Sequence, residues 1–255
     1  AVEYDTGDYH ATMDKLLEIV DRDSFDARAE ESRSRGKLRG LGIAHYIEAC
    51  GIAPSNLVGQ LGARAGLYES ATVRVNATGA ISVMTGSHSH GQGHETAFPQ
   101  VVADMIGIDA SQIDIVHGDT ANTPMGMGTY GSRSLAVGGS AMVKATQKII
   151  DKAKKIAAHL LEASDSDIEL KDGKFSVAGT DKSVAWGDVT LAAYVPHNYP
   201  LADMEPGLEE TAFYDPSNFT YPSGAYACEV EVDPETGKVT VLGFAAADDF
   251  GNIVN

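Results

Sequence analysis

The sequence predicts an α+β fold in which β-hairpins and a mixed sheet pack against helices. Two observations predict it: segments with helical spacing of apolar residues recur along the chain, and several stretches read as paired strands closed by short turns. No internal repeat, low-complexity tract or clear linker separates these segments. We therefore expect one folded unit or two intimately packed lobes, comprising about residues 1–70 with 225–255 and about residues 71–224.

The first elements follow from local patterns. Residues 11–20 place their apolar side chains on one stripe, which predicts an amphipathic helix. The charged residues 26–39 favour a second helix with a solvated face, and residues 38–49 favour a strand. Residues 71–85 alternate apolar and polar side chains, which predicts a hairpin that turns at Gly79.

Residues that begin or end helices and strands guide the next predictions. Residues 96–106 predict a helix that ends at Gly107, and Pro99 is compatible with this helix only inside its first turn. Residues 113–117 predict a short strand. The single tryptophan, Trp186, is expected to pack a short helix.

The second half of the chain contains the longest predicted helix. Residues 140–162 combine an apolar stripe with a face of lysines. Residues 168–177 predict a hairpin that turns at Gly173. Residues 225–232 and 239–246 predict two further strands joined by a Pro- and Gly-containing turn.

The charge balance excludes several partners. The 255 residues include 19 Lys and Arg against 36 Asp and Glu, which gives a formal net charge of −17. Such an acidic surface repels nucleic-acid backbones and anionic lipid, so neither is an expected partner. No run approaches the ~20 apolar residues of a transmembrane helix, so we expect no transmembrane segment.

The two cysteines and the first residues indicate a compartment. Cys50 and Cys228 lie far apart in apolar surroundings, so we expect reduced core residues and a reducing environment. The first ten residues carry neither a basic nor an apolar stretch, so no signal peptide is expected there. Together these features predict a cytoplasmic protein.

One glycine-rich loop has the composition of a binding loop. Residues 86–100 follow a hairpin strand and open a helix, where backbone amides can face an anion. Gly91 and Gly93 allow close approach of the backbone to a ligand, and Gln92 offers both a donor and an acceptor.

Three histidines in the same loop raise the alternative of a metal site. His88, His90 and His94 have suitable spacing, but no HExxH pattern exists because Phe98 stands where the second histidine would be. A glycine-rich turn with polar histidines is therefore favoured over direct metal ligation, which stays the alternative.

A second glycine-rich loop, residues 123–140, precedes the longest helix. It contains a G-x-G-x-x-G match, which is weak support for a dinucleotide fold because no βαβ unit surrounds it. Hydroxyl groups and Arg133 beside these glycines favour a phosphate or pyrophosphate cradle. The alternative is an irregular connector whose glycines only serve turns. The residues concerned are Gly126, Gly128, Thr129, Gly131, Ser132, Arg133 and Ser134.

Elsewhere the sequence indicates no nucleophile with an adjacent base. There is no G-x-S-x-G motif, and neither cysteine has a histidine near it in sequence. Arg64 and Glu69 are interpreted as ordinary residues.

The two loops together resemble the molybdenum hydroxylase family, which includes the large subunits of xanthine dehydrogenases and aldehyde oxidases. The resemblance is carried by GSHSHGQGHET and by the later GDT and GTYGSRS. It continues through YDTGDY, KIAAHLLEAS, YDPSNFTYPSGAYACEVEV and DDFGNIVN, so it spans nearly the whole chain. Within the family, the likeness is greatest to the molybdenum-binding large subunit of aerobic carbon monoxide dehydrogenases.

This resemblance implies a cofactor and a reaction class. The cofactor is molybdopterin cytosine dinucleotide with molybdenum, whose metal is held by pterin sulfurs, so no protein metal ligand is expected. The implied reaction is a two-electron oxidation with oxygen from water; for the carbon monoxide dehydrogenase type, CO and H2O give CO2, two electrons and two protons. The implied cofactor-binding residues are Gly91, Gln92, Gly93, His94, Gly128, Thr129, Tyr130, Gly131, Ser132, Arg133 and Ser134.

The resemblance also implies that functional parts lie elsewhere. The base glutamate is expected beyond Asn255 and the substrate-side cysteine loop before Ala1, so no catalytic residue is assigned here. Copper beside molybdenum stays open, because neither Cys50 nor Cys228 lies in an arginine-flanked loop. We expect an internal fragment or a split subunit, inactive alone, that works with the rest of the large subunit and with subunits carrying [2Fe-2S] clusters and FAD.

Two alternatives to carbon monoxide oxidation stay open. The first is a molybdenum hydroxylase that acts on an aldehyde or an N-heterocycle. The second belongs to another class: a non-catalytic split subunit or assembly module, or a nucleotide-phosphate binder without molybdenum.

Overall fold

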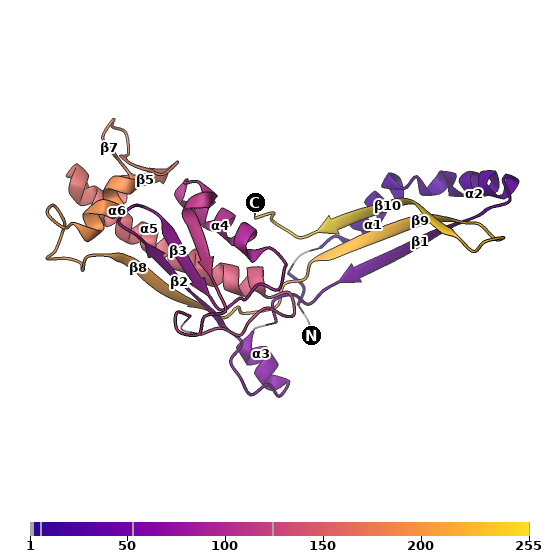
Figure 1. The fold of residues 1–255 in the computed structure, drawn as a ribbon, viewed down its shortest axis with the longest axis horizontal. Helices are drawn as coiled ribbons and strands as arrows, with labels where there is room; N and C mark the ends of the chain where they lie inside the picture. Colours follow the sequence, from indigo (N-terminus) through magenta and orange to yellow (C-terminus); the bar gives the residue numbers. More distant parts are fainter. Residues whose placement is uncertain (1–2, 6, 53, 124, 255) are drawn as a thin grey trace. The chain divides into compact units, whose positions relative to one another are not determined.

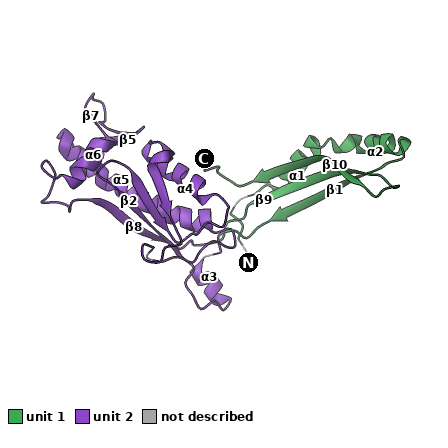
Figure 2. Cartoon of the chain, viewed as in Figure 1, with its two compact units in different colours: residues 1–50, 219–253 green, residues 51–218, 254–255 purple. Residues whose placement is uncertain are grey.

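The computed structural model describes residues 3–5, 7–52, 54–123 and 125–254, and it divides into two compact units (Figure 2). Unit 1 comprises residues 1–50 and 219–253, and unit 2 comprises residues 51–218 with 254–255. From the sequence, the divisions are expected near residues 70 and 225. Pro124 of the second glycine-rich loop and the terminal Ala1 and Asn255 lie outside the described residues.

Unit 1 is an antiparallel sheet of three long strands in the order β1-β9-β10. The strands are β1 (Leu38–Ile47), β9 (Ser223–Val232) and β10 (Val239–Asp249). The turn between β9 and β10 closes with a 2.8 Å hydrogen bond from the Gly237 amide to the Asp233 carbonyl, as the sequence predicts. Helices α1 (Tyr9–Ile19) and α2 (Phe25–Ser34) lie along this sheet (Figure 1), so both predicted helices are confirmed.

The helix-covered side of this sheet has a small core and a network of charges. Leu16 of α1 is fully buried against Ala225 and Ala227 of β9. Further along β9, Glu229 accepts hydrogen bonds from both Arg28 (3.0 Å) and Arg39 (2.6 Å). Small apolar side chains and ion pairs together attach the helices to this face.

Unit 2 is built around a four-stranded sheet in the order β4-β3-β2-β8. Its strands are β2 (Glu69–Val75), β3 (Ile81–Thr85), β4 (Ile113–Val116) and β8 (Leu208–Tyr214). The predicted hairpin is confirmed as β2 and β3, and Gly79 in its turn has a φ of 89°. β3 and β4 are parallel, whereas the other pairs are antiparallel.

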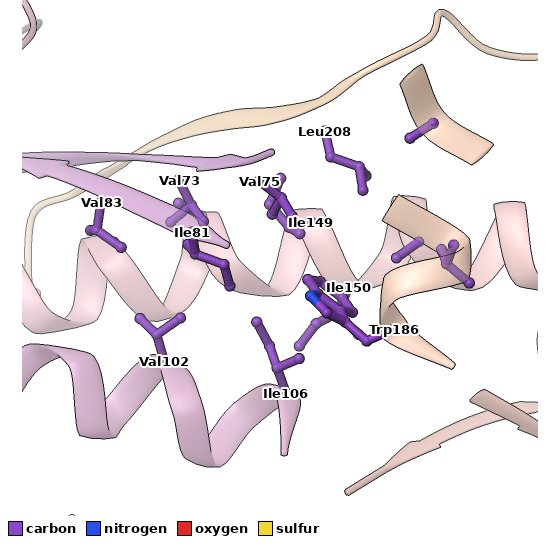
Figure 3. Packing of buried hydrophobic residues seen from close by; sticks show 14 of the residues in the cluster. Val73, Val75, Ile81, Val83, Val102, Ile106, Ile149, Ile150, Trp186 and Leu208 are labelled. Atoms are coloured by element: carbon purple, nitrogen blue, oxygen red, sulfur yellow. The ribbon is translucent and has the colours of Figure 1, made fainter. Parts of the chain in front are cut away.

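Helices cover this sheet and complete the main core. α5 (Ser140–Leu161) contacts β2 and β8, and α4 (His94–Ile106) contacts β4. Figure 3 shows Val73, Ile81 and Val83 of the hairpin facing side chains from α4 and α5. Trp186 is buried at the start of α6 (Trp186–Tyr194), and its indole N–H donates to the Gly79 carbonyl at 3.0 Å, which confirms its packing role.

The remaining elements are short. The predicted hairpin at Gly173 is confirmed as β5 (Ile168–Lys171) and β6 (Lys174–Val177), to which β7 (Ser183–Ala185) adds a third strand. The strands β7 and β8 and the short helix α3 (Ser55–Gln60) are not predicted by the sequence patterns. In the described part of the chain, none of the helices combines the length and the apolar character needed to cross a membrane.

Two local predictions need correction. α4 begins at His94, two residues earlier than expected, so Pro99 lies in the second turn of the helix. Its missing N–H removes one intrahelical hydrogen bond there. As expected, neither Cys50 nor Cys228 forms a disulfide, but both are half-buried rather than core residues.

Candidate functional site

The two glycine-rich loops meet because of the parallel pairing of β3 and β4. Met84 near the end of β3 lies opposite Val116 at the end of β4. Residues 86–93 leave β3 and residues 117–133 leave β4, so both loops emerge at the same edge of the sheet. In open parallel α/β sheets, loops at the carboxyl ends of neighbouring strands are the usual position of ligand sites, and this parallel pair places its two loops in the same way.

The loops touch through glycine backbones. A Cβ atom built on Gly86 would lie 2.1 Å from the Gly126 Cα, and one built on Gly126 would lie 2.4 Å from the Gly86 Cα. Since no side chain fits at either position, glycine at both is a steric requirement of this crossing.

A cavity of about 140 Å³ lies beside this crossing. It is lined by Thr85 at the end of β3, by Gly86 and His88 of the first loop, and by Gly118, Asp119, Thr120, Thr123 and Gly126 from the segment that follows β4. The Thr123 hydroxyl oxygen is buried and has no hydrogen-bond partner among the described residues. Buried polar atoms are normally hydrogen-bonded, so this hydroxyl is a candidate contact for a ligand.

Asp119 gives the cavity an acidic wall. Its carboxylate accepts hydrogen bonds from the Asn122 side chain (2.5 Å) and the Ala121 amide (2.9 Å), and these bonds lower the Asp119 pKa. The carboxylate therefore stays ionised at neutral pH. A negative charge here repels phosphate and can accept hydrogen bonds from the N–H groups of a ligand.

Arg133, expected to hold a phosphate, instead lies in the interior. Its guanidinium is 2.9 Å from the Glu69 carboxylate, and both side chains are fully buried. The other N–H groups donate to the backbone carbonyls of Ile52, Leu67, Tyr68 and Gly128 at 2.6–3.3 Å. Each of its five N–H groups thus has a protein acceptor, so in this structure Arg133 supports the loop from beneath.

Glu69, interpreted from the sequence as an ordinary residue, is the buried partner of Arg133. It begins β2, and its carboxylate also accepts from the amides of Ser70 (3.1 Å) and Met127 (3.3 Å). The signal in the sequence was a charged residue at the start of the strand face that continues with Ala71, Val73 and Val75. This pattern does not indicate that the partner of Glu69 is Arg133.

A second close contact joins the first loop to the helix that follows the second. Residues Ser134–Gly139 form η3, a π-helical turn that leads into α5. A Cβ atom on Gly138 would lie 2.3 Å from the Ser87 hydroxyl oxygen, which is buried and has no partner among the described residues. π-helical turns are frequent at functional sites.

The predicted residues of the first loop have different environments. Gly91 and Gln92 are exposed, and the Gln92 side-chain oxygen accepts from the His90 amide. His94 is buried, with its ring 3.1 Å from the Ser87 carbonyl and stacked on Phe98. Gln92 is therefore accessible to a ligand, whereas His94 packs in the interior against Ser87 and Phe98.

The predicted residues of the second loop also divide into exposed residues and residues that contact other parts of the protein. Tyr130, Gly131 and Ser132 are exposed. The hydroxyl of the buried Ser134 donates to the Thr129 hydroxyl at 2.8 Å, so these two groups are paired with each other.

The start of α4 holds a carboxylate of its own. Glu95 accepts a hydrogen bond from its own backbone amide and lies 2.8 Å from the His117 ring, and these contacts lower the Glu95 pKa to about 2. The Glu95 carboxylate therefore adds a negative charge to the first turn of α4. The His88 ring lies 4.9 Å from that of His90 and 4.8 Å from that of His117.

No group of three or more potential ligands with the geometry of a metal site occurs among the described residues.

An α+β domain with two glycine-rich loops crossing beside a cavity has the architecture of a cofactor-binding domain. Comparisons with known proteins identify the cofactor. The family description that matches residues 15–255 is "Molybdopterin cofactor-binding domain". The chain belongs to this family, which confirms the resemblance indicated by the loop motifs.

Individual relatives agree with this assignment. The carbon monoxide dehydrogenase large chain of Hydrogenophaga pseudoflava is 40% identical over 259 residues, which cover 99% of this chain and 31% of the relative. A crystal structure of Cu,Mo-CO dehydrogenase in its carbon monoxide reduced state matches with a TM-score of 0.88 and 38% identity, covering 100% of this chain and 32% of that chain. The crystal structure of quinoline 2-oxidoreductase from Pseudomonas putida 86 matches with a TM-score of 0.87 and 38% identity. The match covers 98% of this chain and 32% of that chain. The chain thus spans about a third of the length of these relatives.

Proposed function

We propose that this chain is the molybdopterin-binding part of an oxidoreductase large chain of the carbon monoxide dehydrogenase type. The observation that carries the proposal is the crossing of the two glycine-rich loops at Gly86 and Gly126, with a polar cavity beside it. The full enzyme would convert CO and H2O to CO2, two electrons and two protons. Further subunits with [2Fe-2S] clusters and FAD would accept the electrons.

The lining of the cavity fits part of such a cofactor. Thr123 offers an unpartnered hydroxyl, and the ionised Asp119 can accept from N–H donors of a pterin. A volume of about 140 Å³ holds only a portion of a dinucleotide, so the rest would lie over the exposed loop residues. When bound, the cofactor supplies the two-electron redox chemistry, whereas these residues bind and orient it.

We infer distinct tasks for the predicted contact residues. The exposed Gly91, Gln92, Tyr130, Gly131 and Ser132 are proposed to touch the cofactor directly. A second group is proposed to hold the two loops in position without touching the cofactor. It comprises Gly93, His94, Gly128, Thr129, Arg133 and Ser134. Cytosine as the nucleotide base is part of this proposal and follows from the family resemblance.

A second candidate is hydroxylation of an N-heterocycle. It is favoured by the match to quinoline 2-oxidoreductase, whose TM-score of 0.87 and 38% identity are close to those of the CO dehydrogenase structure. The two candidates share the cofactor site and differ in the substrate.

The test is the molybdenum and CMP content of the complete protein that carries this sequence, by metal mass spectrometry and by acid release of the nucleotide. Near-equimolar molybdenum and CMP is expected. Absence of both from native material would refute the proposal. CO-dependent or quinoline-dependent reduction of a dye by the same sample distinguishes the two substrates.

A matched pair of variants links the result to the cavity. Thr123→Val removes the buried hydroxyl with little change of shape, and it should lower molybdenum and CMP content together. Thr240→Val, at an exposed position of β10 in unit 1, is the control and should leave both unchanged.

A further inference from the structure

The sheet of unit 1 has a second face that is apolar. In β9, Ala225 and Ala227 point toward Leu16 on the helix side. Because side chains alternate along a strand, Val230 and Val232 point to the opposite side. We call this side, lined by Leu38, Val230, Val232, Val239, Val241 and Phe244, the open face.

The strand register brings these side chains together. Val232 lies between Leu38 of β1 and Val239 of β10, and Val230 lies opposite Val241. The exposed fractions are 54% for Leu38, 59% for Val239, 61% for Val241 and 66% for Phe244. The open face is therefore a continuous apolar patch over three strands.

The distribution of charge is the reverse of that in an ordinary one-sided sheet. An antiparallel sheet with one face in water normally has polar side chains on that face. Here the charged Arg39, Glu229 and Glu231 lie on the helix-covered side, where Arg28 and Arg35 pair with the two glutamates. The apolar residues of the open face are typical of a sheet that is buried on both sides.

Two glycines leave room for a close partner. Gly40 and Gly42 lie on the open face in β1, and a Cβ atom built on either would have no neighbour closer than 3.8 Å. At one end of the face, Tyr46 donates a 2.9 Å hydrogen bond to Asp248. A packed apolar surface can therefore approach the backbone of β1 while the polar pair remains at the border.

We propose that the open face binds an apolar segment from the remainder of the same large chain. This inference rests on the proposed function, in which the domain is part of such a chain. Relatives have about two thirds of their length outside the matched region, since the match covers 31–32% of each. A segment of the same polypeptide associates at high effective concentration.

Charge argues against a second copy as the occupant. Each copy has a formal net charge of −17, so two copies repel each other on approach. A covalently linked segment overcomes such repulsion more easily, because its association is intramolecular.

The test uses the complete large chain with a new cysteine on either side of β10. Val241→Cys lies on the open face, and Thr240→Cys is the matched control on its exposed neighbour, which faces the other way. Maleimide should modify the thiol of the Thr240→Cys variant at least about tenfold faster than that of the Val241→Cys variant, and denaturant should abolish the difference. Equal rates in the native protein would overturn the proposal.

A photo-crosslink identifies the occupant. p-Benzoylphenylalanine in place of Phe244 should crosslink to a peptide of the same polypeptide that lies outside these 255 residues. The crosslinked product should keep the mass of a single large chain and should not gain the mass of a second copy. A crosslink to residues 51–218, to a second copy, or to an iron–sulfur or FAD subunit would overturn the proposal.

Molybdenum and CMP are measured on the same samples. A protected thiol in Val241→Cys without molybdenum or CMP would refute the cofactor proposal and leave the docking face intact. Normal molybdenum and CMP with an unprotected thiol in Val241→Cys would refute the docking face alone.

Discussion

Glu69 and Arg133 are 64 residues apart in sequence, yet their side chains form a fully buried ion pair at 2.9 Å. The pair links the first residue of β2 to the residue of the second glycine-rich loop that directly precedes η3. Through Gly128 and Met127, it also fixes the backbone of that loop. The loop is thus positioned by a charge pair beneath it.

The first prediction concerns this pair. Arg133→Met should lower the free energy of unfolding by about 3–5 kcal/mol, because it leaves the Glu69 carboxylate buried without a partner. Thermal or urea unfolding of cofactor-free protein measures the effect. Arg74→Met is the control: its ion pair with Glu209 is about half exposed, so the cost should be about 0–1 kcal/mol.

The same variant distinguishes support of the loop from direct phosphate binding. If Arg133 acts from beneath the loop, the unfolding transition and the molybdenum content should fall together. Loss of molybdenum with unchanged stability of the cofactor-free protein would instead assign Arg133 to the cofactor phosphate.

A second prediction concerns the loop crossing. Gly126→Ala should separate the two loops, since its Cβ atom would lie 2.4 Å from the Gly86 Cα, and molybdenum content should fall severalfold. The control is Gly187→Ala in α6, where the added methyl group meets no atom within 4 Å. That change should be neutral or stabilise by about 0.5–1 kcal/mol. Wild-type molybdenum content in Gly126→Ala would contradict the role of the crossing.

The pH dependence of stability gives a third prediction. The Glu95 pKa is lowered from 4.5 to about 2 by its own backbone amide and by His117. Its contribution is therefore complete above about pH 4.5 and is lost as the pH falls toward 2. The difference in unfolding temperature between wild type and Glu95→Gln should shrink over this range. A difference that stays constant from pH 6 to pH 2 would show that the carboxylate has no such role.

A fourth prediction concerns the attachment of α2 to the sheet of unit 1. Burial raises the Glu229 pKa, but hydrogen bonds from Arg28 and Arg39 outweigh this effect, so the pKa is lowered overall. Glu229→Gln should destabilise unit 1 by about 1–3 kcal/mol, because two largely buried arginines lose their shared anion.

Hydrogen exchange of the β9 amides in unit 1 measures this loss. Glu18→Gln, which breaks an exposed pair with Lys15, is the control and should change exchange by less than about 0.5 kcal/mol. Equal effects of the two variants would mean that the Glu229 contacts contribute no more than a surface pair.

The local sequence pattern was sufficient to predict most of the helices and strands. The hairpin at Gly79 and the helix that ends at Gly107 follow from short-range geometry, because both glycines adopt positive φ angles at the turn or the cap. β8 was missed because its sequence, LEETAFY, has two adjacent glutamates and only partial alternation. The strand exists because pairing with β2 along seven residues stabilises it.

The loop residues show what such patterns leave undetermined. Composition pointed to the glycine-rich loops, and the motif resemblance pointed to their cofactor. The burial of Arg133 and the pairing of Glu95 with His117 depend on partners 64 and 22 residues away. No local periodicity encodes these distances.

The sequence by itself thus determined the α+β class, most helices and hairpins, and the family to which the loops belong. Only the tertiary structure decided that β3 pairs with β4 in parallel, that Gly86 meets Gly126, and that Arg133 turns inward to Glu69. The physical reason is the range of the interactions involved. Turns and helix caps depend on neighbouring residues, whereas a loop crossing and a buried ion pair depend on how the whole sheet and its helices pack.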